Sequence, residues 1–320
     1  MLTVSAPGKL MLFGEHAVVY NRPCLVTSVD HRMTVQLKKR GDNRIILNAP
    51  KVGLKDYLCL IDDLEKSHPK EGQFVLRAVF NFFKKYQNRT GLEIETRSEF
   101  SSEFGLGSSS AVTVSTLRAL AELFGIKIEK KELFELAYKT VLDIQGVGSG
   151  FDIAAAIWGG ILYFVTGGKS IKPLKTKKLP LIIGYTGIKA DTASLVKMVA
   201  EEIKNKPTKI NQIFDKIVKI VNQAKRELES SNFEKVGQLM NLNQDLLRKL
   251  GVSSRELENL IEAALAAGAS GAKLSGAGGG DCMIALYPKE KLNSIKMAIE
   301  KAGGKIIKVK IPAQGVKIEK

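Results

Sequence analysis

EFGLGSSSAVTV, residues 103–114, is the stretch of sequence on which the fold depends. Two glycines, Gly105 and Gly107, lead into three consecutive serines, and good helix formers follow as far as Phe124. Residues 92–96 alternate apolar and polar side chains, which predicts a strand just before the glycines. A strand, a glycine turn and a serine-capped helix form a cradle for an anion. Glycines let backbone N–H groups approach a phosphate, and the helix N-terminus adds donors without partners.

The same pattern also fits an ordinary loop that ends in a serine N-cap. The stretch is not a Walker A loop, because no Gly-Lys-Ser/Thr ends it. It is not a GxGxxG dinucleotide fingerprint either, because the third glycine is missing. The choice between a plain loop and an anion cradle therefore depends on the sequence motifs near the two ends of the chain.

Composition places the chain among globular proteins. At 320 residues, with 44% hydrophobic and 26% charged residues, it is long enough for one large domain or two ordinary ones. The three cysteines are far apart and in no metal spacing, so we expect small buried thiols in a reducing cytoplasm. The longest uncharged apolar-rich run, 153–168, is too short and too rich in glycine to span a bilayer, and no signal segment begins the chain. We expect a cytoplasmic protein without a membrane partner.

The net charge of +16 suits either a nucleic-acid partner or an anionic substrate. Most lysines stand beside glutamates in helical segments, as on solvated helix faces. No basic stretch is interleaved with aromatic residues, as a single-strand binder requires. We therefore favour a surface that attracts anionic substrates and predict no nucleic-acid partner. A non-catalytic nucleic-acid-binding protein stays as a remote alternative.

The order of the elements predicts an α+β fold. The first fifty residues are rich in β-formers, and their opening reads as two short strands broken at Pro7-Gly8. Residues 166–180 contain glycines, prolines and lysines without periodicity, which is typical of a linker. We predict an N-terminal domain over 1–168, a linker over 169–180 and a C-terminal domain over 181–320. Further helices are expected at 74–86, 130–142, 192–205, 210–230, 233–250 and 254–267, with strands at 160–165, 181–185, 271–274 and 282–287.

Single residues with chemical potential are weak signals on their own. Lys9 follows Pro7-Gly8, but a lone lysine near an N-terminus is usually a solvated charge. Asp152 opens a predicted helix, where an aspartate is usually an N-cap. Glu15 and His16 resemble an acid/base pair, although such neighbours more often satisfy each other. The three glycine-rich segments are expected to converge near a cleft between the two domains.

Three segments in order resemble the three motifs of the GHMP kinases, a superfamily that includes galactokinase, homoserine kinase, mevalonate kinase and phosphomevalonate kinase. They are APGKLMLFGEHAVVY (6–20), GLGSSSAV (105–112) and KLSGAGGGDC (273–282). Two more, GYTGIKADTASLV (184–196) and MNLNQDLLRKLGVSS (240–254), are similar to segments of archaeal-type mevalonate kinases, the branch that the chain resembles most. The resemblance implies a two-domain fold, with an N-terminal ribosomal-protein-like domain and a C-terminal α/β sandwich-type domain.

The resemblance also implies the activity, which is transfer of the γ-phosphoryl group of ATP, with Mg²⁺, to the 5-hydroxyl of mevalonate. Asp152 matches the catalytic aspartate, and Lys9 matches the lysine beside it, which keeps the aspartate ionised and stabilises the transferring group. Ser109 is the expected Mg²⁺ ligand. The nucleotide phosphates are expected on Gly105, Leu106, Gly107, Ser108, Ser109 and Ser110. The acceptor is expected near Glu15, His16, Lys189, Thr192, Gly276, Ala277 and Gly278.

Three departures from the family pattern keep other interpretations open. The position of the family's magnesium-binding glutamate holds Val141, so Asp143, Glu103 or water is left as the second metal contact. The place of the arginine that meets the substrate carboxylate holds Ala190, with Lys189 as the candidate replacement. The lead into the phosphate loop and the GSGFD around Asp152 keep phosphomevalonate kinase as the alternative. A homodimer is compatible with the family, but no pattern in the sequence establishes it.

Overall fold

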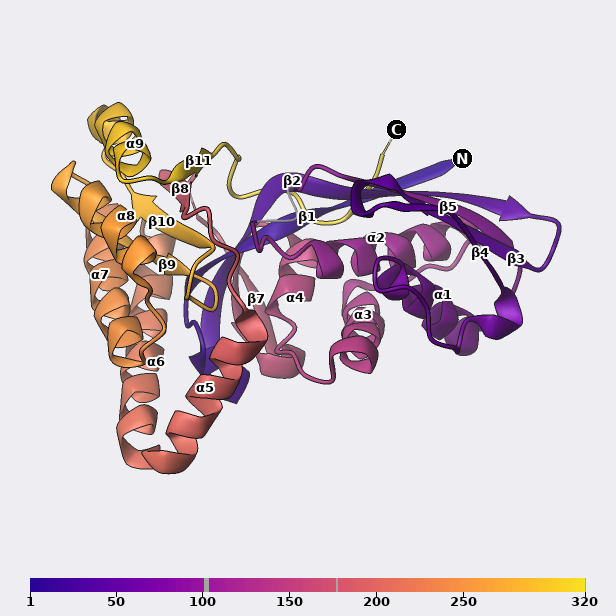
Figure 1. Cartoon of the computed structure of the whole chain (residues 1–320), viewed down its shortest axis with the longest axis horizontal. Coiled ribbons are helices and arrows are strands. Elements are labelled where there is room, and N and C mark those ends of the chain that lie inside the picture. The colour runs from indigo at the N-terminus through magenta and orange to yellow at the C-terminus, as the bar shows by residue number, and fades with distance from the viewer. Residues whose placement is uncertain (101–103, 177, 320) are drawn as a thin grey trace.

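The computed structural model describes residues 1–100, 104–176 and 178–319. In the first part of the chain, four helices lie on one face of a large, mostly antiparallel sheet (Figure 1). A smaller antiparallel sheet with its own helices follows. The predicted α+β character is confirmed.

Two long strands form the centre of the first sheet. Strand β1 (Leu2–Phe13) pairs along most of its length with β2 (Pro23–Arg40). The predicted break at Pro7-Gly8 is wrong, because β1 runs through it with only a shift of register between these residues. Proline lacks an N–H to donate, so the ladder is disturbed locally while the strand continues.

The first sheet has the order β12-β1-β2-β5-β3-β4, and β6 pairs with both β2 and β7. Strand β7 lies inside the segment predicted as a linker, and it pairs with β6 from Val165↔Ser170 to Ile161↔Leu174. The linker prediction is therefore wrong for this stretch. Five consecutive residue pairs with β6 make it a strand, and the sequence of the stretch alone does not reveal this pairing. The remaining bounds are β3 (Arg44–Ala49), β4 (Leu54–Leu60), β5 (Gly91–Ser98), β6 (Ile161–Val165), β7 (Ser170–Leu174) and β12 (Lys317–Ile318).

The helices of the first part are α1 (Gln73–Tyr86), α2 (Ser108–Leu123), α3 (Lys130–Gln145) and α4 (Phe151–Trp158). Helix α1 buries the apolar stripe that its sequence period predicts, including Val75, Val79 and Phe82. Helix α2 lies in the middle of the layer and packs on β1, β2, α1 and α3, so it is buried on nearly every side. Burial of this kind fixes the helix whose first turn the sequence predicts as an anion cradle.

The second sheet has the order β11-β8-β10-β9, from β8 (Leu181–Tyr185), β9 (Gly271–Ser275), β10 (Cys282–Leu286) and β11 (Lys305–Ile307). Its helices are α5 (Thr192–Asn205), α6 (Pro207–Glu229), α7 (Phe233–Lys249), α8 (Arg255–Ala266) and α9 (Leu292–Lys301). Helix α7 covers the edge strand β9. Asn241 and Gln244 accept hydrogen bonds from the N–H groups of Ala272 and Leu274, each at 3.0 Å. These bonds satisfy donors that an open edge would leave unpaired.

The end of the described chain returns to the first sheet, and both termini lie close together in Figure 1. Strand β12 pairs with β1 at Val4↔Ile318, and Arg32 donates to the carbonyl oxygens of Gln314 and Gly315, both at 2.8 Å. We propose that the N-terminal structural unit includes β7 and this returning segment, rather than ending at residue 168.

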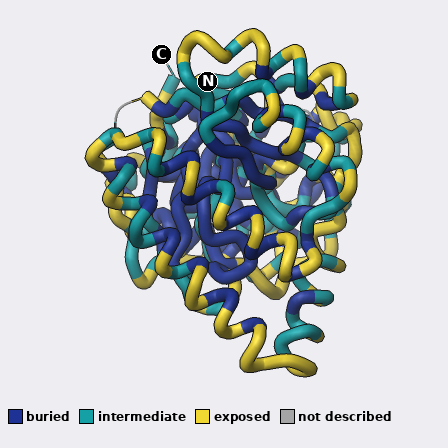
Figure 2. Tube along the Cα trace, turned by 90° about the vertical axis from the view of Figure 1, so that its left-hand side faces the viewer, coloured by how far each residue is buried: buried dark blue, intermediate teal, exposed yellow. Residues whose placement is uncertain are grey.

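Burial separates a continuous interior from an exposed helical arm. Figure 2 shows the buried trace inside the layers and the exposed trace at the lower tip, where the turn between α5 and α6 lies. Cys24, Cys59 and Cys282 are free and buried, which confirms the prediction of small buried thiols. Among the described residues, no helix is both long enough and apolar enough to cross a membrane.

Candidate active site

One cleft brings together segments from all parts of the sequence. It is lined by β1, by the residues just after β1, by the glycine loop before α2, by the start of α4, by α5 and by the loop between β9 and β10. Seven residues predicted for the site contribute to its walls: Lys9, His16, Gly105, Leu106, Thr192, Gly276 and Ala277.

The start of α2 presents backbone N–H groups that have no partner within the helix. Gly107, the N-cap, has φ 83° and supplies no side-chain cap, and Ala111 N donates to Gly107 O at 3.1 Å. The N–H groups of Ser108, Ser109 and Ser110 therefore precede the first full helical hydrogen bond and have no partner within the helix. A buried helix that begins this way favours an anion at its N-terminus.

Lys9 holds the loop before α2 at two points. Its Nζ donates to Gly105 O and its backbone N donates to Leu106 O, each at 2.9 Å. Lys9 and Asp152 both lie beside Gly107, where an added Cβ would be 3.0 Å from Lys9 Cγ and 3.8 Å from Asp152 Cβ. The described residues contain no ion pair between Lys9 and Asp152, so the ammonium is engaged by the loop and not by the carboxylate as the sequence suggests.

Asp152 lies in the first turn of α4, and the N-cap of that helix is Gly150. The Ser110 hydroxyl donates to Asp152 Oδ2 at 2.5 Å, and Ile153 N donates to Oδ1 at 3.0 Å. A hydroxyl hydrogen bond to a charged oxygen is among the stronger ones, and it fixes the carboxylate relative to the start of α2. Of the three serines, Ser110 thus has a partner that sequence reasoning did not identify.

The serine next to it is differently placed. The Ser109 hydroxyl makes no hydrogen bond with any residue that the structure describes, and Ser108 is exposed.

Val141, at the position of the family's metal-binding glutamate, is buried on α3. Asp143 accepts from Asn81 Nδ2 and Lys139 Nζ, both at 2.8 Å, and does not line the cleft. The other candidate for a second metal contact, Glu103, lies outside the described residues.

Glu15 does not line the acceptor side of the cleft, contrary to the prediction. Its side chain is fully buried and forms an ion pair with Lys273, which is also fully buried. The neighbouring His16 does face the cleft, and its Nε2 donates to Ala277 O at 2.8 Å. Burial lowers the pKa of His16, opposed by this hydrogen bond and by the charge of Glu15.

The remaining acceptor-side predictions have mixed outcomes. Thr192 lines the cleft at the start of α5, whereas Lys189 is exposed and is not part of its wall. Gly276 and Ala277 line the cleft directly. Gly278 is required by packing, because it has φ 86° and a Cβ there would lie 2.0 Å from Val252 O.

Asp281 is a cleft residue that sequence reasoning missed. It follows the glycines of the third motif, has φ 54°, and accepts from Ala190 N at 3.1 Å. Its Oδ2 would be 2.7 Å from a Cβ at Gly105, so the carboxylate faces the loop before α2. Burial raises the pKa of Asp281, opposed by the Ala190 N–H and by the charges of Lys9 and Lys189. The quoted motif contains this aspartate, but only the fold shows that it turns toward the phosphate loop.

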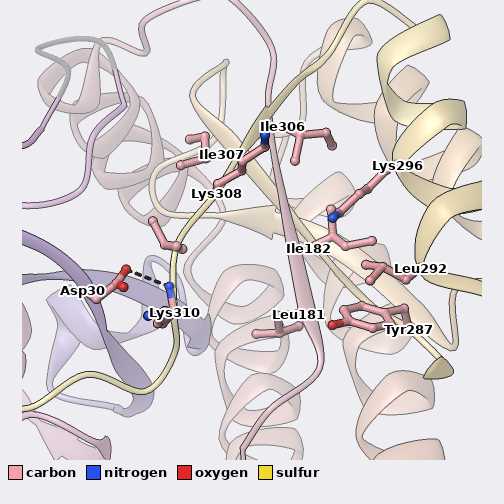
Figure 3. A pocket seen from close by; sticks show the side chains of 11 residues that line it. Asp30, Leu181, Ile182, Tyr287, Leu292, Lys296, Ile306, Ile307, Lys308 and Lys310 are labelled. Atoms are coloured by element: carbon pink, nitrogen blue, oxygen red, sulfur yellow. Dashed lines mark hydrogen bonds between the residues drawn. The ribbon is translucent and has the colours of Figure 1, made fainter.

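A second hollow lies apart from this cleft, where β11 leaves β8 and the chain crosses to the first sheet (Figure 3). Its walls combine apolar side chains with Asp30, Lys296, Lys308 and Lys310, and Lys310 N donates to Asp30 Oδ1 at 2.7 Å. It contains none of the residues predicted for the site, so we place the candidate active site in the cleft that contains Lys9.

Comparison with known proteins agrees with this geometry. The family model for the GHMP kinases N-terminal domain matches residues 73–160, and the model for the GHMP kinases C-terminal domain matches residues 224–305. Mevalonate kinase from Pyrococcus abyssi is 35% identical over 100% of this chain and 98% of its own length. The Thermococcus sibiricus mevalonate kinase is also 35% identical, over 98% and 97% of the two chains.

A solved structure extends the likeness to three dimensions. The crystal structure of Methanococcus jannaschii mevalonate kinase superposes with a TM-score of 0.83 at 29% identity, covering 96% of this chain and 97% of that one. The predicted two-domain fold is confirmed. The chain is an ATP-dependent kinase of small molecules that belongs to the GHMP kinases, in the mevalonate kinase family.

Proposed function

We propose that the chain transfers the γ-phosphoryl group of ATP to the 5-hydroxyl of mevalonate in the cleft that contains Lys9. The observation that carries this proposal is that Lys9 and Asp152 both lie beside Gly107, the N-cap of α2. A carboxylate, an ammonium and a set of free N–H donors are the groups that phosphoryl transfer to an alcohol requires.

In this proposal, each group has a separate task. Asp152, oriented by Ser110, accepts the proton of the attacking hydroxyl. The N–H groups at the start of α2 hold the phosphates of the nucleotide. Lys9 stabilises the negative charge on the transferring phosphoryl group, and its bonds to Gly105 O and Leu106 O keep the loop in place while it does so.

The residues present fit a magnesium ion. Mg²⁺ in such sites is usually held by one or two protein oxygens together with substrate phosphates and water. The Ser109 hydroxyl is without a hydrogen bond among the described residues and lies at the helix start where those phosphates would bind, so we propose it as the protein ligand. The ion would neutralise phosphate charge during the transfer.

The charge of the cleft supports mevalonate over phosphomevalonate as the acceptor. Among the described lining residues, Lys9 is the only lysine or arginine, and burial lowers the pKa of His16 and so favours its neutral form. Lys9 is assigned to the transferring phosphoryl group, so a second phosphate on the acceptor would find no cation in the wall. Asp281 would repel it.

An assay coupled to ADP release, with mevalonate and phosphomevalonate tested side by side, checks the proposal. We expect turnover with mevalonate and little with phosphomevalonate. Activity on phosphomevalonate alone would reject the assigned acceptor, and activity on neither compound would reject the proposed function.

A further inference from the structure

The ion pair between Glu15 and Lys273 is the most deeply buried charge pair in the described structure. Both side chains are 0% exposed, and they join a residue just after β1 to a residue of β9. Lys273 Nζ also donates to Leu274 O at 2.5 Å. Glu15 Oε2 has no hydrogen-bond partner among the described residues. The reaction proposed above uses neither side chain directly.

Two further contacts join the same two segments. Ser275 Oγ donates to Met11 O at 2.8 Å, and His16 Nε2 donates to Ala277 O at 2.8 Å. With the ion pair, three side-chain contacts connect residues 11–16 with residues 273–277. The first segment continues β1, which carries Lys9, and the second begins the glycine-rich loop of the opposite wall.

Stability alone does not account for a pair of this kind. Taking an ammonium and a carboxylate out of water costs more than most buried pairs recover, and apolar side chains of similar volume usually serve stability as well or better. What an ion pair adds is a defined register between the two segments. A buried charge is stabilised only next to its partner, whereas an apolar side chain can pack against several alternative surfaces. The glycine-rich loop has few side chains of its own with which to fix its position.

We propose that Glu15 and Lys273 are a positioning pair, which fixes the register of the loop 275–280 against β1 so that the wall containing Ala277 faces Lys9. Neither residue touches the reacting groups, and both act through His16 and the loop. The catalytic half of this inference rests on the proposed function, whereas the structural half can be tested without any substrate.

The decisive variant replaces both charges. The single variants E15Q and K273M each leave one buried charge without its partner, so we expect both to have a lower Tm and reduced activity. The double variant E15M/K273M removes both charges and keeps a similar volume. We expect its Tm to return to the wild-type value or above, while kcat/KM for the acceptor stays about tenfold to a hundredfold lower, because the wall is no longer held in register.

A double variant with wild-type Tm, kcat and KM would overturn the proposal, since the pair would then serve stability only. D215N is the matched control. It breaks the Arg22–Asp215 ion pair, which also joins segments far apart in the sequence but is partly exposed and outside the cleft. We expect its kcat and KM to remain those of the wild type.

Histidine NMR provides a readout that needs no substrate. The chain has three histidines, so the His16 imidazole can be assigned by substitution. We expect the Nε2–H signal bonded to Ala277 O to be present in the wild type and in D215N, and to shift or broaden in E15M/K273M. An unchanged signal would reject the positioning role even if the acceptor proved to be a different compound. A changed signal in a protein inactive on mevalonate would reject only the proposed function.

Discussion

Removal of a single hydroxyl, in the variant S110A, tests how the candidate base is held. Ser110 Oγ donates to Asp152 Oδ2 at 2.5 Å, and Ser110 itself is buried at the start of α2. A hydrogen bond to a charged group contributes about 1.5–3 kcal/mol. If this energy is used to hold the carboxylate toward the attacking hydroxyl, its loss lowers kcat by about tenfold to about 150-fold.

The assay is steady-state turnover with saturating ATP, in which we expect kcat to fall while KM for ATP changes little. The matched control is S115A, which removes a buried hydroxyl from the same helix, where Ser115 Oγ donates to Met33 O at 2.9 Å. That variant should lose stability through an unsatisfied carbonyl but keep its kcat. If S110A and S115A have the same kcat, within about threefold of the wild type, then Ser110 does not position Asp152 and this part of the mechanism is wrong.

Three other predictions follow from the same structure. D152N keeps an acceptor for Ser110 but removes the base, so we expect turnover to fall at least about a hundredfold, and near-wild-type turnover would remove Asp152 from the catalytic role. Burial lowers the pKa of His16 from 6.5, so the unfolded chain takes up the His16 proton at a higher pH than the folded chain does. The free energy of unfolding therefore falls, by the contribution of His16, as the pH drops below about 6.5. Urea unfolding of the wild type and H16N at two pH values checks this, since the contribution of His16 to the pH dependence of the free energy of unfolding should be present only in the wild type. G278A forces a Cβ to 2.0 Å from Val252 O at φ 86°, so we expect a loss of about 2–5 kcal/mol by denaturant unfolding, against a smaller loss for G276A, where no atom lies within 4 Å of the added Cβ.

Sequence reasoning worked where the local pattern determines the structure. The helices 192–205 and 233–250 and the strand 181–185 were predicted within a residue or two of their ends, since amphipathic period and flanking residues are local properties. Strand β7 was missed for the opposite reason. It is short and is stabilised by pairing with the neighbouring strand β6, which no pattern in its own residues reveals. The pairing of the equally short β12 with β1, at the other end of the chain, is likewise not visible in its own residues.

The residues of the candidate site also fall into those that the sequence predicts and those whose position depends on distant contacts. The glycine loop was predicted from its own sequence pattern, and Lys9 and Asp152 were predicted from the family resemblance; the structure brings all three to one place. Glu15 was assigned to the acceptor because it stands beside His16. Its burial depends on Lys273, far along the chain, and could not be read from the first motif. The orientation of Asp281 likewise depends on Ala190 and on a backbone conformation that the sequence does not specify.

The pairing of β12 with β1 has a consequence for how the protein is made. Strand β1 is synthesised long before β12, so the outer edge of β1 at Val4 and Ser5 has no partner until β12 has also been made. An unpaired strand edge is a template for association with other chains. A chain in which β12 has not yet paired is therefore more prone to associate through this edge of β1 than the folded protein is.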